Sequence, residues 1–276
     1  NDFPVVAGGV ALDSGDINGV NMTDMTLVND HPVTITFESE GAGYENSLGY
    51  YKLDEDGNIT DVQFVWTNAS DTELNAGDTA TLDVSGGDQF ALFIVADGAG
   101  NNDFSQMENG SFEFQNADGS PATADSVDPQ LVFVGTDGSV TSLAGDVFHT
   151  AGQGNQVNLN SDGEQHAVSG IDTVSGELMI GFEDLNRDGN SDDDFNDLII
   201  SLDIGTATAR ALDATSIAAD IELADVDSSE LISATITIAG GFQDGDTVDL
   251  PDGVLNGSGV TVTSAAYDAN TGTYKL

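Results

Sequence analysis

Short apolar segments alternate with polar turns along most of the chain. Seven of them are rich in β-branched and aromatic residues, and they span 33–37, 62–66, 79–84, 90–95, 111–114, 131–134 and 177–180. Such segments predict β-strands, and Asp-Gly pairs at 56–57, 118–119, 137–138, 162–163 and 252–253 favour tight turns. No segment holds the apolar spacing of an amphipathic helix for long. The pattern predicts an all-β fold arranged as a β-sandwich.

A change in composition predicts a domain boundary near residue 204. The apolar stretch 198–204 is followed by small residues only at 205–209. We therefore expect one domain at 33–204 and a smaller β-sandwich domain at 205–276, with strands within 234–238, 244–250 and 266–274. The second domain is either incomplete or completed by the N-terminal segment 1–32, whose apolar stretches at 5–7 and 25–28 would then supply strands of a split domain.

The charge balance excludes several classes of partner. The chain has 49 acidic and 4 basic residues, which gives a formal net charge of −45. Nucleic acid and anionic membranes are poor partners for such a surface. Calcium sites, adaptation to a salty medium and disorder each explain an acidic excess, but the 39% content of hydrophobic residues argues against disorder. We expect a soluble, mature part of a larger protein, since no apolar run of about twenty residues and no signal peptide is present.

Residue types also bear on chemistry. The absence of Cys excludes disulfides and thiolate ligands. The three His residues are scattered, so that solvent-facing or satisfied positions are expected for them. Sequence motifs of hydrolases, zinc proteases and nucleotide-binding loops are missing. We expect that the protein is not an enzyme.

The most informative segment is an acidic loop directly before the apolar run 198–200. Residues 182–197 contain seven carboxylates and one Arg. Two carboxylates about 4 Å apart repel by roughly 4 kcal/mol at an effective dielectric near 20, so converging acids require a cation. Asp184-x-Asn186-x-Asp188-Gly189 matches the first half of an EF-hand-type calcium loop, but its twelfth position is Phe195 and not Glu.

The missing bidentate ligand must therefore come from Glu183, Asp192, Asp194 or Asp197. The sequence predicts a calcium site in a loop between strands; the alternative is a solvated acidic turn. The full set of candidate ligands is Glu183, Asp184, Asn186, Asp188, Asp192, Asp193, Asp194, Asn196 and Asp197. Phe182 and Phe195 flank the loop, and we expect them to be core anchors.

Other segments carry weaker signals. A second loop rich in oxygen ligands is either a metal or ligand loop or an ordinary turn; its candidate residues are Asp97, Gly98, Asn101, Asn102 and Asp103. Tyr44, Asn46 and Tyr50 are candidates for a ligand pocket, although such aromatic residues are often buried in sheets. Asp225 and Asp227 are candidates for calcium binding at a domain junction, with a solvated turn as the alternative.

Three pieces of the first domain resemble the ligand-binding domain of giant bacterial RTX-type adhesins. They lie at 41–51, at 92–98, and at 181–185 together with 194–198, of which Asp194-Phe195-Asn196-Asp197-Leu198 is the most specific. The resemblance covers roughly 33–204. In the second domain, 224–228, 240–242 and 267–273 are similar to the cadherin-like repeats of the same adhesins.

The resemblance implies an extracellular module of a larger, calcium-stiffened adhesin on a bacterial surface or secreted from it. It implies several bound Ca²⁺ ions, adjoining domains, and a ligand that is the C-terminus of a peptide on a surface protein, with calcium contacting its carboxylate. Two alternatives remain: a calcium-dependent lectin, in which glycan hydroxyls take the place of the carboxylate, and a structural spacer whose calcium only stiffens the chain.

Overall fold

The chain forms two compact units, at 1–213 and 214–276. The computed structural model describes residues 2–17, 19–20, 25–27, 30–70, 72–150, 154–173, 175–187, 189 and 191–204, and the strand segments 235–237, 266–268 and 273–275. The division at 213/214 falls nine residues after the predicted boundary at 204/205. Segment 1–32, which the sequence left as a separate segment, is part of the first unit.

The first unit confirms the predicted all-β class. Its five-stranded sheet has the order β10-β11-β12-β1-β4, formed by Ala167–Ile171, Leu178–Phe182, Leu198–Asp203, Val33–Ser39 and Thr79–Leu82. Its seven-stranded sheet has the order β8-β7-β6-β3-β2-β5-β9, formed by Val140–Ser142, Gln130–Gly135, Gly110–Gln115, Ile59–Trp66, Ser47–Leu53, Gln89–Val95 and Val147–His149. Neighbouring strands are antiparallel throughout. The described part of this unit also contains three short helical turns, namely α1 (Gly98–Asn101), η2 (Phe104–Gln106) and η3 (Gly154–Leu159).

The two sheets pack face to face around one hydrophobic core. Alternate residues of β1, such as Ile35 and Phe37, meet Leu92 and Ile94 of β5, and β12 adds Ile200. This is the inward-facing alternation that strands of a sandwich require. Burial of side chains from both sheets therefore holds β2 and β5 of one sheet against β1 and β12 of the other.

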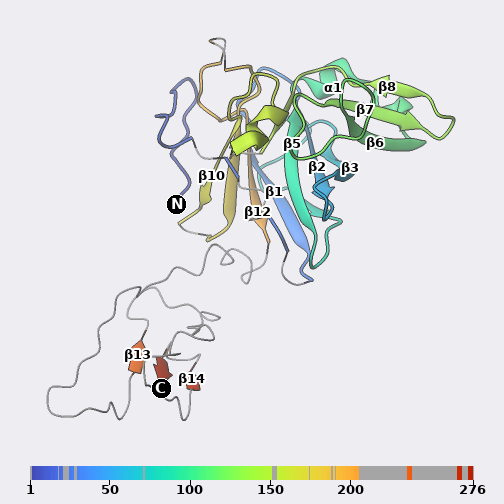
Figure 1. The fold of residues 1–276 in the computed structure, drawn as a ribbon. Coiled ribbons are helices and arrows are strands. Elements are labelled where there is room, and N and C mark those ends of the chain that lie inside the picture. The colour runs from blue at the N-terminus through green and yellow to red at the C-terminus, as the bar shows by residue number, and fades with distance from the viewer. Residues whose placement is uncertain are drawn as a thin grey trace, which may run out of the picture. The chain divides into compact units, whose positions relative to one another are not determined.

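A second core explains why β2 and β5 are buried on both faces. Tyr51 and Phe93 point away from the first core and pack against Phe114 of β6, with ring centroids 5.6 and 5.2 Å from it. Strands β6 and β7 therefore fold over the outer face of β2 and β5, and in Figure 1 they run across the direction of β3. The sheet bends between β3 and β6. All residues of these two strands are described, and Val62↔Phe112 is the one register pair that they form.

The first part of the N-terminal segment lies along the five-stranded sheet and the acidic loop, and residues 25–27 bond to residues 87–90 at the start of β5. The amide of Phe3 donates to the carbonyl of Ile171 over 3.0 Å, and the amide of Leu12 donates to the carbonyl of Asp193 over 2.9 Å. The described hydrogen bonds of this segment are thus made within the first unit. The predicted split domain with 205–276 stays a prediction, because nearly all of 205–276 lies outside the described residues.

In the second unit, the described residues form a three-stranded antiparallel sheet. Its order is β13-β15-β14, with β13 at Thr235–Thr237, β15 at Thr273–Lys275 and β14 at Ala266–Asp268. Strands β13 and β14 fall within the predicted segments 234–238 and 266–274, and β15 begins within the second segment and ends one residue beyond it. The predicted strand at 244–250 and the calcium candidates Asp225 and Asp227 lie outside the described residues.

Within the described ranges, no helix is long and apolar enough to cross a membrane.

Candidate metal centre

The acidic loop joins the ends of two neighbouring strands. Strands β11 and β12 end their pairing at Phe182↔Leu198, and the amide of Asp197 donates to the carbonyl of Phe182 over 3.1 Å. Glu183 and Asp184, which directly follow β11, therefore face Asp197, which directly precedes β12. Antiparallel pairing brings these acids together although thirteen positions separate Asp184 from Asp197.

Two groups of carboxylates share Glu183. The first contains Glu183, Asp184 and Asp197, and the second contains Glu183, Asp192 and Asp194; in each group one oxygen per residue lies within 4.8 Å of the others. Four of the five side chains are buried, and Asp192 is exposed. A hard cation coordinated by oxygens alone, such as Ca²⁺, fits this donor set better than a metal that prefers nitrogen or sulfur.

One buried oxygen in this cluster lacks a partner within the protein. Glu183 is 1% exposed, and its Oε2 atom makes no hydrogen bond. Among the described residues, none of the ion pairs involves Glu183, Asp184 or Asp197. A buried, unpaired carboxylate is costly, so either a proton or a cation must compensate it.

The pKa values of the cluster show the same imbalance. Burial raises the pKa of Glu183 to about 7, and the charge of Asp192 adds to the shift. Burial, followed by the charge of Asp184, raises the pKa of Asp197 to about 9, and burial also raises the pKa of Asp184. Without a cation, the cluster holds protons near neutral pH.

Asn46 connects the cluster to the other sheet. Its Nδ2 donates to Oδ2 of Asp184 over 2.7 Å, and its Oδ1 accepts from the amide of Asp97 over 3.0 Å. Asn46 is fully buried and directly precedes β2, whereas Asp97 follows β5. The loops before β2 and after β5 thus meet the acidic loop through one side chain.

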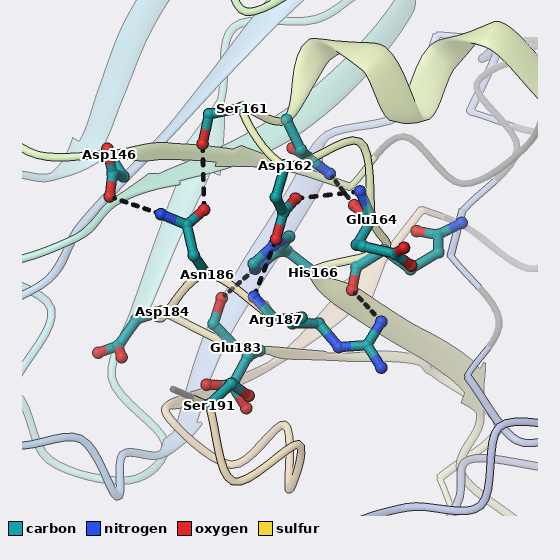
Figure 2. A network of polar contacts seen from close by, with 12 residues as sticks. Asp146, Ser161, Asp162, Glu164, His166, Glu183, Asp184, Asn186, Arg187 and Ser191 are labelled. Carbon is teal, nitrogen blue, oxygen red and sulfur yellow. Dashed lines mark hydrogen bonds and ion pairs between the residues drawn. The ribbon is translucent and has the colours of Figure 1, made fainter. Parts of the chain in front are cut away.

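The only basic residue of the acidic loop is directed away from the cluster. Nε of Arg187 donates to Oδ1 of Asp193 over 2.6 Å, Nη1 donates to the carbonyl of Gln165 over 2.9 Å, and the guanidinium lies 5.2 Å from the ring centroid of Phe195. In Figure 2 the side chains of Arg187 and Asp184 point to opposite sides. Arg187 therefore holds the shape of the loop and leaves the carboxylates unneutralised.

A polar network supports the outer side of the loop, as Figure 2 shows. His166 is buried and stacks on Phe148 at 3.7 Å; its ring nitrogens lie 3.0 Å from the carbonyl oxygen of Glu183 and 3.0 Å from Oδ2 of Asp162. Asp162 also accepts from the amide of Arg187 over 2.9 Å. This confirms the expectation of a satisfied position for His166 and fixes the backbone at Glu183.

The second half of the loop is held by close packing. Phe195 and Phe182 are both fully buried, which confirms the prediction that they anchor the core. Asp194 accepts from the amide of Gly9 over 2.6 Å. A Cβ atom at Gly41 would lie 2.4 Å from Oδ1 of Asn196, so a larger residue at this point would require the side chain of Asn196 to move.

A hollow of about 390 Å³ opens onto the carboxylates. It is lined by Gly41, Gly43, Tyr44, Glu183, Asp184, Leu185, Asp192 and Asp197. Tyr44 is 41% exposed and was predicted as a pocket residue; it lies in the same hollow as four of the predicted metal ligands. Gly41, Gly43 and Leu185 were not predicted as site residues; the Gly-x-Gly spacing directly before Tyr44 was the available signal.

Three other predicted metal ligands have protein partners instead. Nδ2 of Asn186 donates to Asp146 over 3.2 Å, and its Oδ1 accepts from Ser161 over 3.1 Å. Asp193 pairs with Arg187, and the side chain of Asn196 lies against Gly41. The cluster differs from the EF-hand-type register, because Glu183, Asp184 and Asp197 lie at two strand ends and only Asp192 and Asp194 lie at alternate positions within the loop. Asp188 lies outside the described residues.

The second predicted loop is held by its own hydrogen bonds. Asp97 accepts from the amide of Glu45 over 3.3 Å and from Nδ2 of Asn101 over 2.9 Å. Asn102 bonds to Gly98 and Ala144, Asp103 accepts from Ser105, and a Cβ at Gly98 would meet Ser47. None of these predicted residues lines the hollow, and the loop reaches the cluster through Asn46.

Tyr50 also lies apart from the hollow. It is 3% exposed, and its hydroxyl accepts from the amide of Asp83 over 3.0 Å. Its position in the first core does not support ligand contact.

The acidic loop and the strands around it match the model of a protein family. Residues 84–205 match the model of a family described as a domain of unknown function (DUF4114). The DUF4114 match covers less than half of the chain and includes β5 to β12. Comparisons with curated proteins and with solved structures give no match.

The folded unit is larger than the DUF4114 match. Strand β1 lies between β12 and β4, and β2 lies between β5 and β3, so residues before 84 complete both sheets. Gly41, Tyr44 and Asn46 also precede the match, and they contribute to the hollow or to its support. The site therefore needs the segment 33–83 as well as the DUF4114 region.

Proposed function

We propose that the first unit is a calcium-dependent adhesion module of an extracellular bacterial protein that binds the C-terminus of a peptide. The observation that carries the proposal is the unpartnered, buried Oε2 of Glu183 in a carboxylate cluster on which a hollow opens. Calcium bound there would supply a positive charge that can accept a ligand carboxylate. Oxygen-only sites of this kind suit the millimolar calcium found outside cells.

The charge of the protein supports a metal-mediated contact. A surface with a net charge of −45 repels an acidic peptide end, and the described residues place no basic side chain in the hollow. Glu183, Asp184 and Asp197 would hold the cation from the protein side, while the exposed Asp192 lies at the open side. Tyr44 offers the ligand an apolar ring with a polar tip.

The exposed ring of Tyr44 also favours a second candidate, a calcium-dependent lectin. Sugar hydroxyls coordinate calcium, and the apolar face of a sugar packs on an aromatic ring. In this case a glycan takes the place of the peptide carboxylate in the same hollow. A structural spacer, the third possibility, would bind calcium without a ligand.

A titration with labelled peptides in calcium separates these functions. Free-acid peptides should bind and the same peptides with amidated C-termini should not, while competition by simple sugars would support the lectin. Glu183→Gln keeps the shape of the side chain and removes its charge, so it should abolish binding; the exposed Glu55→Gln in the β2–β3 turn should not change it. Binding that survives both chelator and Glu183→Gln would contradict the proposal.

A further inference from the structure

A second hollow lies on the seven-stranded sheet, between β3 and β6. It has a volume of about 810 Å³. Its lining includes the consecutive residues 59–64 of β3 and 110–114 of β6. A hollow on one face of a sheet is lined by alternate residues, because successive side chains point to opposite faces. Consecutive lining residues on both strands indicate a gap between two strand edges.

The pairing of β3 with β6 also indicates a gap between their edges. The pair Val62↔Phe112 sets a register in which Phe64 would face Gly110, yet β3 and β6 form no pair beyond Val62↔Phe112. Both strands are well paired on their other edges, β3 with β2 and β6 with β7. The sheet therefore opens on one side of Val62 and Phe112.

On the other side of this pair the chain fills the gap with its own extended segment. The amide of Ile59 in β3 donates to the carbonyl of Ala122 over 3.0 Å, and the amide of Ala122 donates to the carbonyl of Phe114 in β6 over 2.9 Å. Bridges Asn58↔Thr123 and Gln115↔Pro121 flank these bonds. One end of the gap thus already holds an extended segment that bonds to both strand edges.

The side chains at the open end are apolar and aromatic. Phe64, Phe104 and Phe112 are half-buried, and the ring of Phe64 lies 4.9 Å from each of the other two. Met107 completes this lining, and its flexible thioether adapts to varied partners. Asp61 and Glu113 lie just across the Val62↔Phe112 pair and add two carboxylates to the lining of the hollow. The side chain of Asp61 is 63% exposed, and its Oδ2 lies 3.9 Å from Nζ of Lys52.

We propose that this gap is a second binding surface, which takes an extended peptide segment with apolar side chains and at least one Lys or Arg. The segment would pair with the free edges of β3 and β6 as the chain's own segment 121–124 does at the other end. Main-chain pairing would give affinity, and the Phe side chains and the two acids would give specificity. A second copy of this chain is a poor occupant because its net charge is also −45.

The test uses the whole chain in calcium and a hexapeptide of alternating Lys and Val, acetylated and amidated so that it has no carboxylate. We expect saturable binding, slower amide hydrogen exchange at 64–66 and 110–112, and no displacement by a free-acid peptide. A version with Glu in place of Lys should bind more weakly. Failure to bind, equal binding of the Glu version, or displacement by the free-acid peptide would each overturn the proposal without touching the function proposed for the metal centre.

Variants locate the site. Ser111→Trp places a large ring at an exposed position of the gap and should abolish binding, whereas Ser142→Trp, at an exposed position of β8, should not. Asp61→Asn with Glu113→Gln should weaken binding by about two- to tenfold, as expected for exposed ion pairs. The control pair Asp137→Asn with Glu55→Gln removes two exposed acids elsewhere. Equal effects of test and control variants would contradict the assignment, provided that thermal melts show all variants folded.

Discussion

Nδ2 of Asn46 donates a hydrogen bond of 2.7 Å to Oδ2 of Asp184, and this bond joins the two sheets at the candidate metal centre. The residues are 138 positions apart in the chain, and both are buried. Because Asn46 also accepts from the amide of Asp97, one amide side chain orients a carboxylate of the acidic cluster and a neighbouring loop together. Asn46 is therefore a positioning residue and does not line the hollow.

Replacing Asn46 should weaken both stability and metal binding. Asn46→Ala leaves the amide of Asp97 and an oxygen of Asp184 without their partner, and each buried orphan costs about 1–3 kcal/mol. Chemical denaturation in calcium should show this loss, and a calcium titration should show lower affinity. Asn109→Ala, at an exposed position before β6, is the matched control. An unchanged calcium affinity would mean that Asn46 does not orient Asp184.

Substitution of Gly41 should lower stability, whereas the same substitution at Gly43 should not. A Cβ at Gly41 would lie 2.4 Å from Oδ1 and 3.2 Å from the backbone oxygen of Asn196, while a Cβ at Gly43 meets nothing within 4 Å. Gly41→Ala should therefore destabilise the calcium-loaded protein by about 1–3 kcal/mol, the usual cost of overpacking. Gly43→Ala should have little effect.

A double variant tests the cause. The closest clash is with the side chain of Asn196, so Gly41→Ala combined with Asn196→Ala should recover part of the lost stability. Additive losses in the denaturation experiments would argue against direct contact between the two residues.

Most strands were predictable from the sequence because alternation is a local signal. Segments 33–37, 90–95 and 131–134 lie within β1, β5 and β7. Strand β2 was not among the predicted strands, since Ser47–Leu53 lacks alternation of apolar and polar residues. The sheet folds over itself at this strand, so six of the seven residues of β2 are buried. That fold arises from contacts such as Tyr51 with Phe114, which are remote in sequence.

The candidate site was predictable in part, because a high density of acids is also a local signal. The acids are adjacent in sequence, so their density indicated a cluster, and the absence of Glu at position 195 indicated ligands from outside the EF-hand-type pattern. Which acids converge depends on the pairing of β11 with β12, and this selects Asp197 and leaves Asn186 with Asp146 and Ser161. Support by Asn46 depends on how the two sheets pack, which local patterns do not encode.

Calcium binding should depend strongly on pH. The pKa values of Glu183 and Asp197 rise from 4.5 and 3.8 to about 7 and about 9 in the metal-free fold. The folded protein therefore binds these protons more tightly than the unfolded chain. Their contribution to stability is fully present below about pH 4 and is lost as pH rises through 7 and 9. Calcium must displace them, so its affinity should increase from pH 5 to pH 9.

Calorimetry and thermal melts check this dependence. Titrations in buffers with different ionisation enthalpies should show proton release on calcium binding at pH 6. At a hundredfold excess over the dissociation constant, calcium should stabilise the protein by about 2.7 kcal/mol relative to chelator. Glu183→Gln should remove this gain because Glu183 belongs to both carboxylate groups, and Glu55→Gln should keep it. A melting temperature that is indifferent to calcium at pH 8 would contradict the metal centre.

His149 should have the opposite dependence on pH. It is fully buried among aromatic rings, and burial lowers its pKa to about 3. Its Nδ1 lies 3.3 Å from the hydroxyl of Tyr51, and its Nε2 makes no hydrogen bond. The folded state thus requires the neutral ring. The stability that this gives is present above pH 6.5 and is lost towards pH 3, at up to about 1.4 kcal/mol per pH unit.

A mutant cycle separates this effect from that of the acidic cluster. At pH 7, His149→Phe should cost about 1–3 kcal/mol because the hydroxyl of Tyr51 loses its partner, and adding Tyr51→Phe should recover most of the loss. Between pH 6.5 and 4 the double variant should lose less stability than the unmodified chain, whereas Tyr51→Phe alone keeps the histidine and should retain the steep acid dependence. Denaturant melts in saturating calcium measure each slope. Parallel slopes for all four proteins would show that His149 does not control acid stability.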